Sequence, residues 1–272
     1  IDLALKEDIG DGDHTSLSTI PAGKQGEAQL IIKDEGVLAG VAVALEIFKV
    51  VDPKLKVQVL LEDGTRVRNG DIGMYVSGSV HSILVAERLV LNTMQRMSGI
   101  ATTTYHIVKL LADTDTKVLD TRKTTPGMRY FEKMAVKIGG GENHRFGLYD
   151  MVLIKDNHVD YAGGTAKAIE STKRYLAEKN LHIPIEIEVR NLSEVKEVLG
   201  VGGVDRILLD NFDFDHLKEA VKLIDGRFQT EASGGITELN VVDYANCGVD
   251  FVSMGALTHS FKSLDISLKA IK

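Results

Sequence analysis

Residues 120–127, with the sequence DTRKTTPG, place an acid, two bases, three hydroxyls and a Pro-Gly turn directly after a short apolar run at residues 117–119. A strand that ends in such a cluster presents cations where the chain reverses direction. The same arrangement returns at residues 152–158, VLIKDNH. Barrel enzymes hold their active sites at the carboxyl ends of their strands. The two segments therefore predict one anion-binding active site at the edge of a parallel sheet.

Two glycine-containing loops follow the last two predicted strands, at residues 232–236 (ASGGI) and 248–256 (GVDFVSMGA). Glycine lets the backbone approach a ligand closely, and free N–H groups near a helix start bind phosphate. One Gly-Gly pair alone would indicate only a turn, but the loops after the last strands of a barrel commonly hold phosphate. The pair predicts a phosphate site at Ser233, Gly234, Gly235, Ser253, Met254 and Gly255.

Acidic side chains occur in two further predicted strands. Glu186 and Glu188 lie on the same face of the strand at residues 185–189, because side chains alternate along a strand. Asp210 follows the strand at residues 207–209. The simplest explanation is that one of these acids pairs with a base. Carboxylates beside a phosphate site also bind Mg²⁺, so we predict a metal or sugar-hydroxyl role for at least one of Glu188 and Asp210.

Strands and helices alternate from about residue 115, which predicts a parallel sheet that closes, or nearly closes, into a barrel. Six or seven strands are visible, fewer than the eight of a complete barrel, so an incomplete barrel is expected. The predicted strands are residues 118–119, 151–154, 185–189, 207–209, 229–231 and 251–253. The predicted helices are residues 166–179, 192–199, 216–224 and 239–245.

The first hundred residues have an α+β pattern. Strands are predicted at residues 57–60, 66–68 and 72–80, with Asp63-Gly64 and Asn69-Gly70 between them as hairpin signals. Helical spacing of apolar residues predicts a helix at 41–51. Two more helices are expected at residues 82–97 and 101–111, with Ser98-Gly99 interrupting them.

Composition excludes several classes of protein. The net charge of −7 argues against general nucleic-acid binding, which needs a large basic surface. No apolar run approaches the roughly 20 residues of a membrane helix, and no secretory signal pattern opens the sequence. The single cysteine, Cys247, excludes an internal disulfide and a structural zinc site. A cytoplasmic location is expected, and neither a P-loop nor a dinucleotide fingerprint is present.

These motifs resemble, in type and order, those of the quinolinate phosphoribosyltransferase family of type II phosphoribosyltransferases. The resemblance covers nearly the whole length and depends on residues 7–15, 87–88, 98–102, 120–127, 139–145, 154–158, 209–212, 231–236 and 254–258. It implies an α/β fold with an N-terminal α/β sandwich domain (1–99) and an open seven-stranded α/β barrel (100–256). It also implies that a C-terminal helix (257–272) returns to the first domain.

The resemblance implies that quinolinate reacts with 5-phosphoribosyl 1-pyrophosphate and Mg²⁺ to give nicotinate mononucleotide, pyrophosphate and CO₂. A homodimer with shared active sites is expected. For the quinolinate dianion the implied residues are Arg88 (from the partner subunit), Thr121, Arg122, Lys123, His144, Arg145 and Lys155. The implied catalytic residues are Lys123, Lys155, Glu188 and Asp210, and the two acids would also hold Mg²⁺ and the ribose.

Two other functions remain open from the sequence. A phosphoribosyltransferase of the same fold could use nicotinate or another aromatic acid without decarboxylation, and a relative associated with molybdenum transport is a weaker option. The Arg and His cluster favours a dianion over a monoacid. A barrel that only binds a phosphorylated metabolite is the second alternative, and the two acids, Glu188 and Asp210, argue against it because phosphate binding alone does not require carboxylates.

Overall fold

The computed structural model describes residues 1–271 and divides into two compact units. The first comprises Ile1–Tyr105, Tyr130–Gly140 and Ser260–Lys272, and the second comprises His106–Arg129 and Gly141–His259. The chain therefore enters and leaves the first unit more than once. No helix within residues 1–271 combines the length and hydrophobicity that a bilayer-spanning segment requires.

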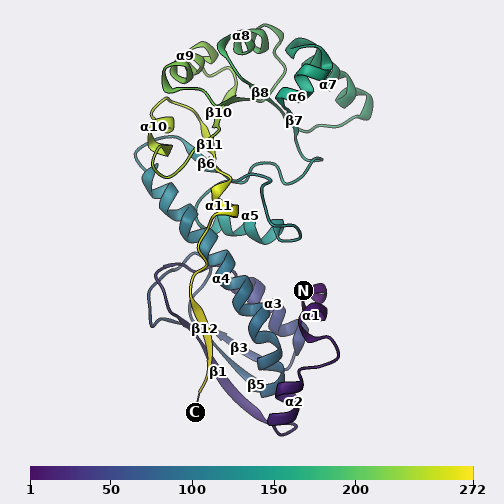
Figure 1. Ribbon diagram of the computed structural model, residues 1–272, viewed down its shortest axis with the longest axis vertical. Helices are drawn as coiled ribbons and strands as arrows, with labels where there is room; N and C mark the ends of the chain where they lie inside the picture. Colours follow the sequence, from purple (N-terminus) through teal and green to yellow (C-terminus); the bar gives the residue numbers. More distant parts are fainter. Residues whose placement is uncertain (272) are drawn as a thin grey trace. The chain divides into compact units, whose positions relative to one another are not determined.

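The first unit is built on a four-stranded antiparallel sheet with the strand order β12-β1-β5-β3 (Figure 1). Alternate residues Ala28, Leu30 and Ile32 of its central strand are buried, as expected for a sheet with one face on the core. Its strands are β1 (Gln25–Ile32), β3 (Lys56–Val59), β5 (Ile72–Ser79) and β12 (Ile266–Ala270), with β2 (Gly36–Val37) and β4 (Arg66–Val67) forming a separate pair. Its helices are α1 (Asp2–Ile9), α2 (His14–Thr19), α3 (Val41–Val51), α4 (Val80–Leu110) and α5 (Arg129–Ile138).

Helix α4 is continuous through Ser98 and Gly99, so the predicted interruption is wrong. The Ser98 hydroxyl donates to the carbonyl of Ala39 and accepts its N–H, which fastens the helix to the segment before α3. A Cβ on Gly99 would collide with the backbone carbonyl of Lys262. The two small residues therefore serve close packing, and they do not end the helix.

The C-terminal segment is also different from the prediction. Only a short helix, α11 (Ala256–His259), occupies the start of the expected helix at 257–272, and β12 follows it. Ile266 and Leu268 are buried on one face and pair with Ile32 and Leu30 of β1. The apolar alternation in this segment has a period of two, which suits a strand.

Neither Asp-Gly nor Asn-Gly closes a hairpin between neighbouring strands, which corrects that prediction. Strand β3 pairs with β5, and β4 pairs with β2. Gly64 and Gly70 have φ values of 88° and 96°, so both do make turns. These turns connect strands of different pairs because β4 belongs to the small second sheet.

The second unit contains six parallel strands in the order β6-β11-β10-β9-β8-β7 (Figure 1). They are β6 (Lys117–Leu119), β7 (Val152–Ile154), β8 (Ile185–Val189), β9 (Arg206–Asp210), β10 (Gln229–Ser233) and β11 (Phe251–Ser253). The expected seventh strand is reduced, within residues 1–271, to a single parallel bridge between Glu142 and Leu119. The α/β fold class and the open parallel sheet are confirmed, with six full strands.

Helices follow these strands around the outer side of the sheet (Figure 1). They are α6 (Asp156–Ala162), α7 (Thr165–Lys179), α8 (Leu192–Val201), α9 (Phe214–Ile224) and α10 (Val241–Ala245). In α9, Leu217, Ala220 and Ile224 form the buried stripe, and Asp213 caps the first turn by accepting the N–H of His216. Amphipathic helices of this kind cover the sheet and leave its carboxyl edge for loops that carry the candidate site.

Candidate active site

A cavity of about 320 Å³ lies in the second unit and is lined from five of the six parallel strands or from the loops that follow them. Eight of the residues predicted for substrate or phosphate line it: Thr121, Arg122, Lys123, His144, Arg145, Lys155, Ser233 and Ser253. Leu153, Leu208 and Glu231 complete the lining. The strand ends thus bring residues more than a hundred positions apart to one cavity.

Two of the four arginine and lysine side chains that line the cavity are the guanidinium groups of Arg122 and Arg145. Burial lowers the pKa of Arg145, and the neighbouring charge of Arg122 lowers it further. The Nε of Arg122 is buried and has no hydrogen-bond partner within residues 1–271. A buried donor without an acceptor is costly, and like charges repel, so both observations favour an anion in this cavity.

The loop after β6 is held by its own hydroxyls and by the segment after β11. The N–H of Lys123 donates to Thr121 Oγ1 at 3.0 Å, and Thr258 Oγ1 donates to the carbonyl of Lys123 at 2.9 Å. A Cβ on Gly255 would lie 3.0 Å from Cδ of Lys123. Gly255 therefore makes room for the lysine, in addition to its predicted place in the phosphate loop.

Asp120 positions the histidine of the site, a role that the sequence did not indicate. Its side chain is fully buried, and Oδ1 accepts the N–H of His144 at 2.9 Å. The Nδ1 of His144 accepts the N–H of Arg145 at 2.7 Å, and the Arg145 guanidinium donates to the carbonyl of Met151. The only indication of this role in the sequence is that Asp120 directly follows a predicted strand.

The predicted acid pair lies beside Lys155. Its Nζ is 3.0 Å from Oε2 of Glu188. Burial raises the pKa of Asp210, and the charge of Glu188 raises it further, while Asn211 Nδ2 donates to Asp210 at 2.7 Å. Two carboxylates that repel each other at a strand edge form an oxygen donor set of the kind that Mg²⁺ prefers. Neither acid is among the residues lining the cavity.

The glycine loop after β10 has the backbone that its sequence requires. Gly234 and Gly235 have φ values of 99° and 61°. A Cβ on Gly234 would collide with the side-chain oxygen of Asn211, which itself has a φ of 55°. The loop after β9 and the loop after β10 therefore fit against each other only because residue 234 has no side chain.

Arg88 is in α4 of the first unit, and its side chain is 60% exposed with Glu87 at 3.8 Å. It is not among the residues lining the cavity. Arg88 is predicted to bind quinolinate in the site of a partner subunit. The structure contains one chain, so this role stays a prediction.

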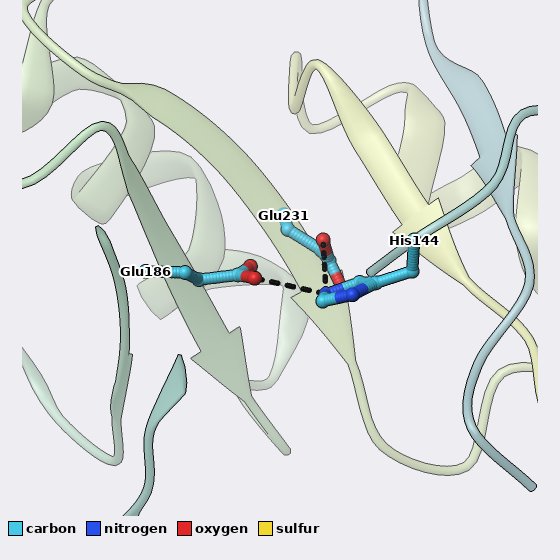
Figure 2. A group of neighbouring side chains, drawn as sticks. All are labelled: His144, Glu186 and Glu231. Atoms are coloured by element: carbon cyan, nitrogen blue, oxygen red, sulfur yellow. Dashed lines mark ion pairs between the residues drawn. The ribbon is translucent and has the colours of Figure 1, made fainter. Parts of the chain in front are cut away.

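Three buried side chains, His144, Glu186 and Glu231, lie together (Figure 2), and two of them, His144 and Glu231, line the cavity. Nε2 of His144 is 2.8 Å from Oε2 of Glu186 and 3.6 Å from Oε2 of Glu231. Both glutamates have no exposed surface, and the guanidinium of Arg206 is 2.9 Å from Glu231. These three side chains have the donor atoms for a metal ion. Arg206 already supplies positive charge to Glu231, so a cation is less needed here than beside Glu188 and Asp210.

Glu231 was not predicted as a site residue. A glutamate in the middle of a short parallel strand is unusual, because an unpaired charge is costly to bury, and this position could have indicated a role in the site. Glu186 carries the same signal in β8. Glu231 and the two leucines of the cavity, Leu153 and Leu208, lie within strands and do not follow an apolar run, so the pattern that marked the other residues does not mark them.

The sequence matches two domain descriptions of one family: "Quinolinate phosphoribosyl transferase, N-terminal domain" over residues 13–98 and "Quinolinate phosphoribosyl transferase, C-terminal domain" over residues 100–269. The chain belongs to the quinolinate phosphoribosyltransferase family. The two matches together cover most of the sequence, including every predicted site residue.

Named relatives of this quinolinate phosphoribosyltransferase family member agree in sequence and structure. A chloroplastic nicotinate-nucleotide pyrophosphorylase (carboxylating) of Arabidopsis thaliana is 51% identical, over 99% of this chain and 81% of its own. A probable nicotinate-nucleotide pyrophosphorylase (carboxylating) of Bacillus subtilis is 41% identical, over 96% of this chain and 89% of its own. The crystal structure of NadC from Streptococcus pyogenes has a TM-score of 0.93 at 39% identity, over 100% of this chain and 95% of that chain.

Proposed function

We propose that this chain catalyses the transfer of the phosphoribosyl group of 5-phosphoribosyl 1-pyrophosphate to quinolinate, releasing pyrophosphate and CO₂ and leaving nicotinate mononucleotide. Its family membership and the reaction named for its relatives support this activity. The observation that carries it in the structure is the cavity with two neighbouring guanidinium groups, Arg122 and Arg145, together with the apolar side chains of Leu153 and Leu208. An aromatic ring with two carboxylates matches both features.

Arg122 and Arg145 would each bind a carboxylate of quinolinate, because a guanidinium can make two parallel hydrogen bonds to it. Thr121 and His144 border the same space, and Arg88 would be supplied by the partner subunit of a homodimer. Leu153 and Leu208 would contact the ring. The pyridine nitrogen is itself the nucleophile, so no protein nucleophile is required.

The phosphoribosyl group would extend toward the glycine loops. Ser233, Gly234 and Gly235 on one loop and Ser253, Met254 and Gly255 on the next would bind the 5-phosphate, mainly through N–H groups. Lys123 and Lys155 would neutralise the pyrophosphate as it leaves. Fixed charges of this type, placed before the reaction, are often worth about 3 kcal/mol each in the transition state.

Glu188 and Asp210 would hold Mg²⁺, whose charge supports the departure of pyrophosphate, and would contact the ribose hydroxyls. The raised pKa of Asp210, caused first by burial and then by Glu188, supports this assignment, since a bound cation would relieve the repulsion.

We also propose a cytoplasmic location on the basis of the single buried cysteine, Cys247. Some relatives carry chloroplastic or mitochondrial in their names, so fractionation of the native host should test it.

The test is to incubate purified protein with quinolinate, 5-phosphoribosyl 1-pyrophosphate and Mg²⁺ while pyrophosphate, CO₂ and nicotinate mononucleotide are followed separately. We expect all three in equal amounts, and none when Mg²⁺ is chelated. Turnover of nicotinate in place of quinolinate would instead establish the non-decarboxylating alternative. Absence of turnover with both acids would favour a barrel that only binds a phosphorylated metabolite.

A further inference from the structure

The three residues of Figure 2 come together from different parts of the second unit. Glu186 is near the start of β8, Glu231 is in the middle of β10, and His144 is in the segment between α5 and β7. His144 and Glu231 line the cavity directly, and Glu186 is behind them. A group with two buried carboxylates so close to an anion site requires an explanation, because their charge opposes the binding of an anion.

Hydrogen bonds assign the proton on His144. Its Nδ1 accepts the backbone N–H of Arg145, so that nitrogen carries no proton. A neutral ring then has its proton on Nε2, which faces Oε2 of Glu186. The Nε2 proton of His144 is thus directed at Glu186, and Arg206 is the only arginine or lysine within hydrogen-bond distance of Glu231 among residues 1–271.

Ionising Glu186 and Glu231 at the same time would be costly in this arrangement. Neither oxygen of Glu186 and only one oxygen of Glu231 has a hydrogen bond of good geometry within residues 1–271, and the two side chains are close enough to hydrogen-bond to each other. One proton on Glu231, donated to Glu186, would satisfy both groups. In agreement, burial and the charge of Glu186 raise the pKa of Glu231 to about 7, against the opposing effects of His144, Arg206 and Ser253.

The proposed reaction needs one proton in this region, so the inference depends on the proposed function. When the bond between the ring carbon and its carboxylate breaks, CO₂ leaves and the electron pair remains on the ring carbon beside the alkylated nitrogen. That carbon must then form a bond to a proton. Arg122 and Arg145 cannot give up a proton in a protein. Nδ1 of His144 accepts a backbone N–H, and its Nε2 faces Glu186 at 2.8 Å. Lys123 and Lys155 also line the cavity, but the proposed function assigns them to the pyrophosphate.

We propose that Glu231 is the general acid that donates this proton to the ring carbon that loses CO₂, with Glu186 and Arg206 as positioning residues. Until it is protonated, the ring carbanion can recombine with CO₂, so the net release of CO₂ depends on this proton transfer. The O–H bond of Glu231 breaks as the C–H bond forms, and Glu231 is left as a carboxylate beside Arg206. A proton from water restores the acid after the product leaves. Charge and atoms balance without an oxidant, a reductant or a further reactant.

The test separates the two chemical steps. Enzyme in excess over quinolinate is mixed with 5-phosphoribosyl 1-pyrophosphate and Mg²⁺, and pyrophosphate and CO₂ are measured over a single turnover. In the wild type the two should appear together. In Glu231→Gln, the rate of CO₂ release should fall about 100-fold or more below the rate of pyrophosphate release, because a general acid usually contributes a factor of this size. The undecarboxylated mononucleotide should then accumulate. CO₂ that keeps pace with pyrophosphate in this variant would overturn the proposal.

Glu231→Asp is the matched control because it keeps the acid but withdraws it from the ring. It should recover part of the CO₂ rate, and a lag equal to that of Glu231→Gln would mean that shape, and not the proton, matters at this position.

If neither variant folds, the wild type still decides the question. The CO₂ step should slow as the pH rises through about 7 while the pyrophosphate step does not, and equal pH dependence of both steps would overturn the assignment. A wild type that makes no pyrophosphate from quinolinate would instead disprove the proposed function itself.

Discussion

Burial at the cavity wall raises the pKa of Glu231 to about 7, so the stability of the folded chain must depend on its protonation. A raised pKa means that the stabilising form is the acid. Its contribution is complete below the unfolded-state value near 4.5 and is lost as the pH rises through the folded-state value. The wild type should therefore lose stability from this residue between about pH 4.5 and pH 7.

Glu231→Gln should remove this pH dependence, since an amide stays neutral. We expect the variant to be more stable than the wild type at pH 8 by up to about 3 kcal/mol, and equally stable at pH 4.5. Urea unfolding at the two pH values measures the difference. The same difference at both values would mean that Glu231 does not titrate between them.

Arg122→Ala should reduce kcat/KM for quinolinate by about 100-fold or more, because two hydrogen bonds to a charged group are lost, at about 1.5–3 kcal/mol each. Arg174→Ala, on the exposed face of α7, removes the same charge from the surface and serves as the control. Steady-state kinetics with both variants measures the effect. Equal kcat/KM values for the two variants would remove Arg122 from the substrate site.

Most of the cavity could be predicted at the residue scale from the sequence. Bases and hydroxyls that directly follow apolar runs stand out, and Arg122, Lys123, Lys155, Ser233 and Ser253 do line the cavity. Glu231 and Leu208 could not be found in this way, because they lie within strands and face inward. Which face of a short strand points into a barrel depends on the curvature of the sheet, and so short a strand carries too little pattern to reveal it.

At the scale of elements, the close contacts of α4 decide which residues it can tolerate. Gly99→Ala places a Cβ against the carbonyl of Lys262, a backbone atom that cannot move aside easily. We expect a loss of about 1–3 kcal/mol in the free energy of unfolding, as for other overpacked sites. Thermal and urea unfolding both measure it.

Gly200→Ala is the matched control for this prediction. Gly200 is also inside a helix, α8, but no atom lies within 4 Å of the position that a Cβ would occupy there, and its φ is not positive. Alanine at this position should stabilise the chain by up to about 1 kcal/mol through helix propensity. A gain at residue 99 as large as the gain at residue 200 would show that Gly99 only lowers helix propensity.

The same contacts explain which elements the sequence predicted poorly. All six parallel strands were found, because each is a short run between turns. The interruption of α4 was wrong because Ser98 and Gly99 resemble a helix stop while their actual partners, Ala39 and Lys262, are far away in sequence. The C-terminal helix was expected from the resemblance, whereas the alternation in residues 266–270 already favoured β12.

At the scale of the whole molecule, the proposed homodimer predicts complementation between two inactive variants. Arg88→Ala and Lys155→Ala should each be nearly inactive, since each would damage both sites of its own dimer. After mixing and exchange of subunits, one site of each heterodimer would contain both native residues, so about a quarter of the wild-type activity should return. Activity assays after mixing, with subunit exchange followed by mass, measure this. Demonstrated exchange without recovery would place Arg88 outside the partner's site.

The pairing of β1 with β12 has a consequence for how the chain is made. Strand β1 can pair with β5 as soon as residues 72–79 have been made, but its other neighbour spans residues 266–270. Throughout elongation, one edge of β1 therefore has free N–H and C=O groups beside the side chains of Leu30 and Ile32, which are buried in the finished fold. An open apolar edge of this kind readily pairs with other chains. A nascent chain stalled before residue 266 would thus be a template for aggregation, and chaperones that shield strand edges should matter most for this protein on the ribosome.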